Sequence, residues 1–188
     1  VVVACNTATA VALADLQREH GVPVIGVIRP EVLAAVRATH NRRIGLLATE
    51  ATVRSHSYPR LVHRHDAGVE MTSVACPLLA PAIQRGDSLD GADEEMVARY
   101  AAPLTAAGVD TVILGCTHFP LAGRLLQRVL PGVTLIDGRR EMGLEVIATL
   151  ERRGLLRAPG PEGGCRFVCS GDPESFRALG TRFLHVPL

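Results

Sequence analysis

The segment that decides the fold is Thr-Val-Ile-Leu-Gly-Cys-Thr-His-Phe-Pro-Leu, at residues 111–121. Residues 112–114 are continuously apolar, which favours a strand that is buried on both faces. A small residue, a cysteine and polar residues follow, and residues 121–130 have the apolar spacing of a helix. A buried strand that leads into a helix is typical of an α/β fold with a parallel sheet.

The first seven residues, Val-Val-Val-Ala-Cys-Asn-Thr, repeat this pattern of apolar strand, small residue, cysteine and polar residues. The chain begins without a Met, inside what we expect to be a buried strand, so we interpret it as a fragment that lacks its N-terminal portion. In open α/β sheets the carboxyl ends of the strands face the ligand crevice. We therefore expect Cys5 and Cys116 to lie on crevice walls.

Strands and helices alternate along the rest of the chain, and Pro30 is expected to break the second strand. The expected strands are residues 1–4, 24–28, 44–48, 69–74, 111–114, 133–136 and 166–169. The expected helices are residues 7–19, 31–39, 93–107, 121–130, 141–153 and 173–179, with one that runs from residue 49 toward residue 62 and a short one after residue 77.

Composition excludes several classes of protein. The 188 residues carry 20 basic and 19 acidic side chains, and this near-neutral balance argues against a nucleic-acid or anionic-membrane partner. No apolar run reaches the roughly 18 residues that a membrane-spanning helix needs. All 20 basic residues are Arg, so this chain offers no Lys for a pyridoxal phosphate Schiff base or a P-loop. Five cysteines without a disulfide framework indicate a reducing cytoplasm.

Two thiols that face each other suit proton transfer at a carbon next to a carboxylate. A Cys at a helix N-terminus is favoured as a thiolate, and the free N–H groups there, with Asn6, Thr7 and Thr117, can bind the carboxylate. One thiolate would remove the α-proton from one face, and the other thiol would protonate the opposite face to give the mirror image. The remaining cysteines lack such surroundings and are interpreted as packing residues: Cys76, Cys165 and Cys169.

Two motifs, Ala-Cys-Asn-Thr-Ala at residues 4–8 and Leu-Gly-Cys-Thr-His-Phe-Pro-Leu at residues 114–121, are similar to the two signatures of the glutamate racemase family. The resemblance extends over almost the whole chain. It implies a cytoplasmic, cofactor-independent isomerase that makes D-glutamate for peptidoglycan, and so serves cell-wall biogenesis and cell shape. It also implies an α/β fold of two lobes, each a parallel sheet flanked by helices, with the active site between them.

The resemblance implies roles for eight residues of this chain. Cys5 and Cys116 would be the catalytic pair, the first acting on D-glutamate and the second on L-glutamate. His118 would also assist proton transfer at Cys116. For Thr49 and Thr52, capping of the following helix is the alternative role. The residues expected to bind substrate are Asn6, Thr7, Thr49, Thr52, Thr117 and His118.

The resemblance further implies domain boundaries and a partner. The first lobe is expected to comprise residues 1–29 and 138–188, and the second lobe residues 30–137. A homodimer is expected, and neither a metal nor another cofactor is. The Asp-Ser-Gly and Pro-Tyr-Gly substrate loops of the family are absent from this chain, so the fragment itself is expected to be inactive.

Three positions depart from the family pattern. Gln84 stands where many members have an acidic residue, and it can form hydrogen bonds but cannot carry charge. Glu31 stands where small residues are usual, and Gly138 stands where Ser is frequent. We expect these changes to affect the rate of the reaction and the tuning of the active site more than the class of reaction.

Two other functions stay open. An aspartate or hydantoin racemase of the same superfamily would use the same two thiols, although the motif that begins at Cys116 favours glutamate. A degenerate binding module would keep the fold without turnover. A nucleotide enzyme is disfavoured because no GxGxxG or Walker motif is present. The histidines His56, His63 and His65 are interpreted as part of a solvated face and not as a metal site.

Overall fold

The computed structural model describes residues 1–85, 91–161 and 163–184, in which parallel strands alternate with helices. The strands are β1 (Val2–Val3), β2 (Ile25–Gly26), β3 (Arg43–Ala48), β4 (Glu70–Ala75), β5 (Thr111–Gly115) and β6 (Thr134–Ile136). The helices are α1 (Asn6–Glu19), α2 (Ile28–Ala38), α3 (Glu50–Arg54), α4 (Ser57–His65), α5 (Leu79–Arg85), α6 (Gly91–Ala106), α7 (Gly123–Val129), α8 (Arg139–Arg152) and α9 (Pro173–Leu184), with a 3-10 turn, η1 (Phe119–Ala122), before α7.

The larger sheet has the strand order β4-β3-β5-β6, and all its pairs are parallel. Ala48 at the end of β3 pairs with Ala75 of β4 and with Gly115 of β5. Three strands therefore end at the same level, and the residues that follow them lie along one edge of the sheet. Thr49 and Cys116 are both placed at this edge.

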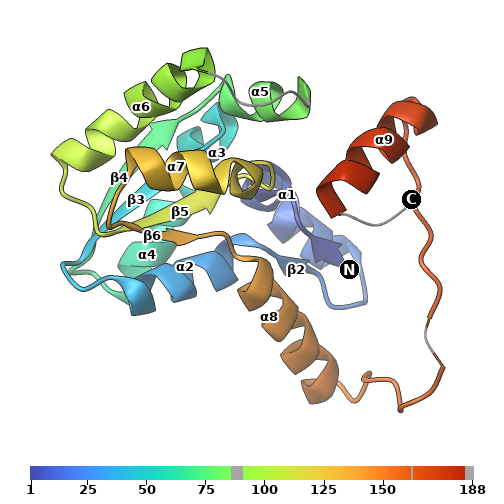
Figure 1. The fold of residues 1–188 in the computed structure, drawn as a ribbon. Coiled ribbons are helices and arrows are strands. Elements are labelled where there is room, and N and C mark those ends of the chain that lie inside the picture. The colour runs from blue at the N-terminus through green and yellow to red at the C-terminus, as the bar shows by residue number, and fades with distance from the viewer. Residues whose placement is uncertain (86–90, 162, 185–188) are drawn as a thin grey trace.

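Helices cover both faces of the larger sheet (Figure 1). Along β3, Ile44 and Leu46 pack against α2 and α4, whereas Leu47 packs on the side of α5, α6 and α7. In β5, Ile113 faces the first of these layers and Val112 the second. Because both faces are covered, these strands are continuously apolar instead of alternating.

The smaller sheet pairs β1 with β2 and is packed against α1. Thr9 of α1 holds the two strands together, because its Oγ1 donates to the Val3 carbonyl (2.9 Å) and accepts from the Val27 N–H (3.4 Å). The expectation that residues 1–4 are buried is wrong, since Val2 is 44% exposed. Among the described strands β1 pairs with β2 alone, so its outer edge is uncovered.

The α/β class and the arrangement of two lobes with parallel sheets are confirmed. The strand expected at residues 166–169 is wrong, because this segment has no regular structure and Val168 is 82% exposed. A strand needs a neighbour for its backbone groups, and no described strand pairs with this segment.

Two helix boundaries also differ from the expectation. Pro30 lies in the first turn of α2, which begins at Ile28, because the missing N–H of Pro costs no helical hydrogen bond there. The helix expected from residue 49 toward residue 62 is divided into α3 and α4. The division falls at His56, which has a left-handed backbone with φ of 52°.

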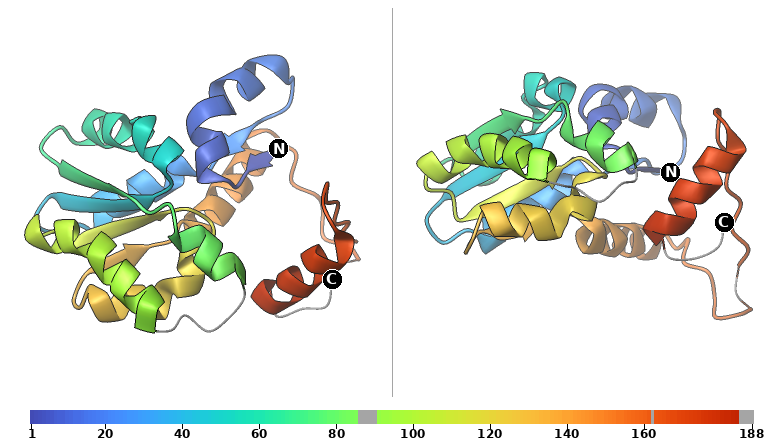
Figure 2. Two further views of the ribbon diagram at one scale, coloured as in Figure 1. Left: turned by 90° about the horizontal axis from the view of Figure 1, so that it is seen from above. Right: turned by 45° about the horizontal axis from the view of Figure 1, so that its top comes forward.

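The C-terminal part of the chain leaves the larger sheet after β6. α8 packs against α2, and α9 stands apart from the sheet, as the two views in Figure 2 show. Phe183 near the end of α9 packs against the core layer of α5, α6 and α7. None of the described helices combines the length and the apolar character that crossing a membrane requires.

We predict that Gly138→Ala destabilises the protein more than Gly132→Ala. Both glycines have positive φ, 70° and 75°, so each substitution carries backbone strain of about 1 kcal/mol. A Cβ at position 132 would meet no atom within 4 Å, whereas a Cβ at position 138 would overlap the side chain of Glu31. Overpacking costs about 1–3 kcal/mol. Chemical denaturation should therefore show that Gly138→Ala lowers the free energy of unfolding by this additional amount.

The Glu31→Ala background provides the control for this prediction. Removing the overlapping side chain should bring the cost of Gly138→Ala down to that of Gly132→Ala. Equal losses for the two alanine variants in the wild-type background would show that the Glu31 side chain does not occupy this space.

Candidate active site

Cys5 and Cys116 each follow a parallel strand, one from each sheet. Cys5 is exposed and is the N-cap of α1, where the Ala8 N–H donates to its Sγ (3.5 Å). Cys116 is 9% exposed. Burial raises the pKa of its thiol, the backbone N–H groups of His118 and Phe119 oppose this rise, and negative charge on Cys5 adds to it. The two sulfurs therefore lie within electrostatic reach of each other.

His118 links Cys116 to α5. Its Nδ1 lies 3.8 Å from the Cys116 Sγ, and its Nε2 lies 2.7 Å from the Oε1 of Gln84. An amide oxygen can only accept a hydrogen bond, so Nε2 carries the ring proton and Nδ1 is the acceptor that faces the thiol. Burial lowers the pKa of His118, which favours this neutral ring. The arrangement can pass a proton between the sulfur and the imidazole.

Three of the predicted binding residues form one cluster of hydroxyl groups. The Oγ1 of Thr7 lies 2.8 Å from that of Thr49 and 3.1 Å from that of Thr52, and the last two are 3.0 Å apart. Thr7 belongs to α1, whereas Thr49 is the N-cap of α3 and accepts from the Thr52 N–H (3.4 Å). The cluster joins the two lobes. Because hydroxyls can rotate, it can donate to an anion that approaches.

Asn6 is turned toward the second lobe and is 2% exposed. Its Nδ2 lies 3.1 and 2.9 Å from the two carboxyl oxygens of Glu31 and 2.7 Å from the hydroxyl oxygen of Tyr58. Tyr58 in turn donates to Glu31. These side chains come from α1, α2 and α4 and are all buried. The Oδ1 of Asn6 has no hydrogen-bond partner.

The Glu31 carboxyl is neutral at pH 7. Burial raises its pKa to about 8, hydrogen bonds from Tyr58 and Asn6 oppose the rise, and the charges of Asp137 and Glu141 add to it. Burial also raises the pKa of Tyr58 well above its ordinary value. A neutral carboxyl avoids the large cost of burying an unpaired charge.

A cavity of about 300 Å³ lies at the junction of the two lobes. Cys116, Thr117, Asn6 and Glu31 contribute to its walls, so it brings three of the predicted site residues to one space. Cys5 lies outside this lining and is open to solvent. The cavity therefore belongs mainly to the Cys116 half of the site.

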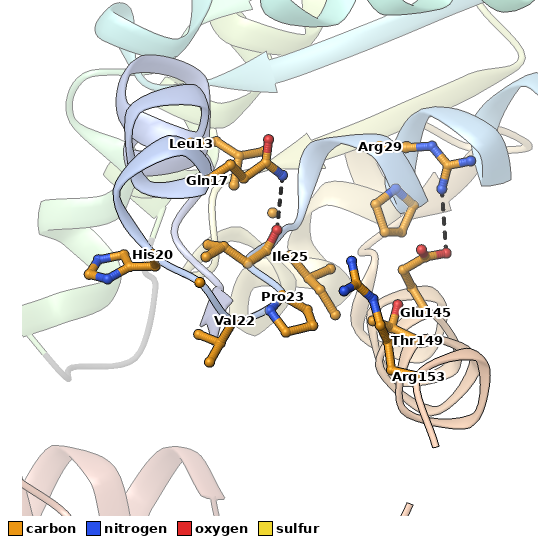
Figure 3. Close-up of a pocket in the computed structure, with 14 residues that line it drawn as sticks. Leu13, Gln17, His20, Val22, Pro23, Ile25, Arg29, Glu145, Thr149 and Arg153 are labelled. Carbon is orange, nitrogen blue, oxygen red and sulfur yellow. Dashed lines mark hydrogen bonds and ion pairs between the residues drawn. The ribbon is translucent and has the colours of Figure 1, made fainter. Parts of the chain in front are cut away.

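A second cavity, of about 450 Å³, lies between the smaller sheet and α8 and contains none of the predicted site residues (Figure 3). An ion pair of Arg29 with Glu145 (3.4 Å) and a hydrogen bond from Gln17 to the Val24 carbonyl (2.9 Å) close parts of its wall. Neither thiol faces it, so we place the candidate active site at the smaller cavity.

Sequence reasoning missed the site contacts of Glu31 and Tyr58. Glu31 lies in the first turn of α2, where an acidic residue is ordinary at a helix start, so its burial had no signal in the sequence.

The packing role expected for Cys76 is confirmed, since it is buried and burial raises its pKa to about 12. The packing role of Cys165 is wrong, because its segment forms no strand and leaves it exposed. The expected exposure is confirmed for His56, His63 and His65.

Residues 1–142 match the family model described as Asp/Glu/Hydantoin racemase. The chain belongs to this family of racemases. The glutamate racemase of Mycobacterium ulcerans (strain Agy99) is 41% identical over 186 residues, which are 98% of this chain and 68% of that protein. Membership of the Asp/Glu/Hydantoin racemase family makes the protein an isomerase of the racemase class.

Solved racemase structures have the same fold. A glutamate racemase isoform from Bacillus anthracis superposes with a TM-score of 0.94 at 36% identity, over 100% of this chain and 70% of that one. The glutamate racemase of Francisella tularensis, solved in complex with D-glutamate, gives a TM-score of 0.90 at 29% identity, again over 100% of this chain and 70% of that one.

We predict that the racemase loses stability as pH rises from about 5 to about 8. An unfolded chain ionises Glu31 near its ordinary pKa of 4.5, whereas the folded protein keeps the proton until about pH 8. The folded state binds the extra proton over this range, so the free energy of unfolding falls, by up to about 1.4 kcal/mol per pH unit. The stabilisation that the protonated Glu31 provides is fully present below pH 4.5.

Denaturation of wild type and Glu31→Gln at several pH values measures this slope. The neutral Gln should remove it, whereas Glu50→Gln, which changes an exposed carboxyl in the first turn of α3, should retain it. A wild-type slope that survives Glu31→Gln would assign the titration to another group.

Proposed function

We propose that this protein interconverts L-glutamate and D-glutamate by two-thiol proton transfer without a cofactor. The observation that carries the proposal is the pair Cys5 and Cys116, each at the carboxyl end of a parallel strand and each within electrostatic reach of the other. The glutamate specificity is supported by relatives that are glutamate racemases and by the complex of one of them with D-glutamate.

The two directions of the reaction use the thiols in opposite roles. With D-glutamate, the Cys5 thiolate takes the α-proton, the electrons of the C–H bond pass into the carboxylate as an enolate, and the Cys116 thiol protonates the opposite face. With L-glutamate, Cys116 is the thiolate that takes the proton and Cys5 is the donor. Two groups are required because one fixed base cannot reach both faces of the carbon.

His118 supports the Cys116 half of this reaction. Its Nδ1 faces the sulfur and can receive the thiol proton, which would leave a thiolate beside an imidazolium. Gln84 holds the other ring nitrogen and so selects the tautomer in which Nδ1 is free to accept. An amide in place of a carboxylate orients the ring without stabilising its charged form.

Hydroxyl and amide groups would bind the substrate around the two thiols. The cluster of Thr7, Thr49 and Thr52 hydroxyls can donate to a carboxylate from both lobes at once. Thr117 and Asn6 lie on the wall of the cavity beside Cys116. Donors that are fixed before the reaction strengthen as enolate charge develops, which lowers the barrier.

The proposal includes the cellular setting. A glutamate racemase would supply D-glutamate for peptidoglycan from the cytoplasm, where thiols stay reduced. A homodimer is part of the same proposal, and sedimentation equilibrium of the full-length protein at several concentrations tests it.

We predict that Cys5→Ser and Cys116→Ser each lower racemisation by the full-length protein at least about 100-fold. A serine hydroxyl is a far weaker acid than a thiol and cannot serve as the base at neutral pH. In D₂O, Cys5→Ser should still exchange the α-hydrogen of L-glutamate slowly, and Cys116→Ser that of D-glutamate. Cys165→Ser, at an exposed cysteine, is the matched control and should keep wild-type rates.

Other results would support the competing functions. Wild-type rates in either catalytic variant would contradict the two-thiol mechanism. Turnover of aspartate or a hydantoin, and not of glutamate, would assign a sibling activity. Glutamate binding without α-hydrogen exchange would identify a binding module.

We predict that Gln84→Glu shifts the acid limb of the pH profile of kcat/KM for L-glutamate to lower pH, by about one unit. A carboxylate against Nε2 stabilises the His118 imidazolium, and this positive charge favours the Cys116 thiolate. The limb for D-glutamate, which reports the Cys5 half, should stay in place. Gln17→Glu makes the same replacement on α1 away from both thiols, and an equal shift there would exclude a specific effect.

A further inference from the structure

Glu31 is a buried acidic residue to which the proposed reaction gives no role. Its side chain is 1% exposed. Asn6 of α1 and Tyr58 of α4 form hydrogen bonds with its carboxyl group, and its side chain occupies the place that a Cβ of residue 138 would take. We call Asn6, Glu31, Tyr58 and Gly138 the junction. Because α1 packs on the smaller sheet and α4 on the larger one, the junction joins the two sheets.

The chain passes the Glu31 carboxyl group twice on its way between the sheets. It leaves the smaller sheet at the end of β2 and enters α2 at Ile28, so that Glu31 lies in the first turn of this helix. It leaves the larger sheet after Ile136, and Gly138 is the N-cap of α8. The carboxyl group therefore lies where a change in its charge acts on both connections at once.

The charged groups that face this carboxyl group favour its neutral form. Asp137 and Glu141, at the start of α8, are acidic, and their charges raise the pKa of Glu31. Cys116, at the end of β5, interacts with Glu31 electrostatically, so a thiolate there would add a further negative charge. Arg139 lies in the same cavity wall, but its guanidinium is paired with Asp137.

The neutral carboxyl group also matches its hydrogen-bond partners. A carboxylic acid can donate from one oxygen and accept at the other, so it can bond in both directions with the Asn6 amide and the Tyr58 hydroxyl. A carboxylate can only accept, and here it would be a buried charge among acidic neighbours. Burial is the largest cause of the rise in the pKa of Glu31 to about 8. Water that reached the carboxyl group would bring this pKa back toward 4.5.

We propose that Glu31 is a proton-dependent latch between the two sheets. With its proton, it holds α1 and the start of α8 against α2 and α4, and loss of the proton favours an open junction in which water reaches the carboxylate. The inference goes beyond the proposed racemisation and does not require it. Because Cys5 directly precedes Asn6, opening of the junction would also move the first thiol relative to Cys116.

The pH range of the latch follows from the two states of Glu31. In the closed junction its pKa is about 8, and in the open junction it approaches the ordinary value of 4.5. The closed state therefore binds a proton that the open state releases, and it is favoured most below pH 4.5. Between these values the equilibrium constant for opening should rise about tenfold per pH unit, and above about pH 8 it should level off.

Native-state hydrogen exchange of the full-length protein between about pH 5.5 and pH 9 tests the latch. The reporting amides are those of Thr9, Glu31 and Met142, whose hydrogen bonds lie in the first turns of α1, α2 and α8. After correction for the intrinsic exchange rates, their opening constants should follow the profile above. The amides of Leu46 and Leu47 in β3 should be more protected at every pH, because the core of the larger sheet stays closed when the junction opens.

Three variants assign the profile to Glu31. Glu31→Gln keeps hydrogen-bonding groups and cannot titrate, so its opening constants should stay within about twofold across the range. Glu50→Gln, at an exposed carboxyl in α3, is the matched control and should keep the wild-type profile. Tyr58→Phe removes a hydrogen bond that opposes the rise in the pKa of Glu31, so its opening constants should level off above pH 8.

Three results would overturn the latch. A rise with pH that persists in Glu31→Gln would assign the titration to another group. Equal opening constants at the reporting amides and at Leu46 and Leu47 would show that Glu31 ionises only when the whole protein unfolds. A flat wild-type profile would leave no proton to link. A protein that follows the expected profile without turning over glutamate would contradict the proposed function alone.

Discussion

The hydrogen bonds among Asn6, Glu31 and Tyr58 are the constraint on which the site depends. They join the first turn of α1, which belongs to the smaller sheet, to α2 and α4 on the larger sheet. Because Asn6 directly follows Cys5, the same bonds position the first thiol relative to the second lobe. A buried network of hydrogen bonds favours one arrangement of the elements that it joins, and in this network the Asn6 Oδ1 has no partner among the described residues.

The two halves of the site are built differently. Cys116 is buried and has a ring nitrogen at its sulfur, so its proton has a defined neighbour to move to. Cys5 is exposed and has a backbone N–H of α1 as its neighbour. The Cys116 thiol, whose pKa is raised by burial, is therefore the one with a side-chain base beside it. Among the described strands, β5 is central in a sheet with helices on both faces, whereas β1 is paired with β2 alone.

Local patterns in the sequence predicted much of the fold and named candidate residues for the site, but they did not predict which of these side chains meet. Continuous apolar runs and Gly or Pro breaks indicated the strands of the larger sheet, because burial on both faces leaves a local signature. The family resemblance of the motif around Cys116 implied that His118 assists at this thiol, and its Nδ1 lies 3.8 Å from the Cys116 Sγ. The prediction of a strand at residues 166–169 was wrong, because a strand depends on a pairing neighbour and composition does not reveal whether there is one.

The sequence by itself determined the α/β class, the family resemblance and the two cysteines as candidate bases, because these depend on local spacing and on the order of elements. Only the tertiary structure decided that Thr7 meets Thr49 and Thr52, that Gln84 holds His118, and that Glu31 fills the space left by Gly138. These contacts join residues that lie 34 or more positions apart. Their partners are chosen by how the helices pack across the sheets, which no local pattern records.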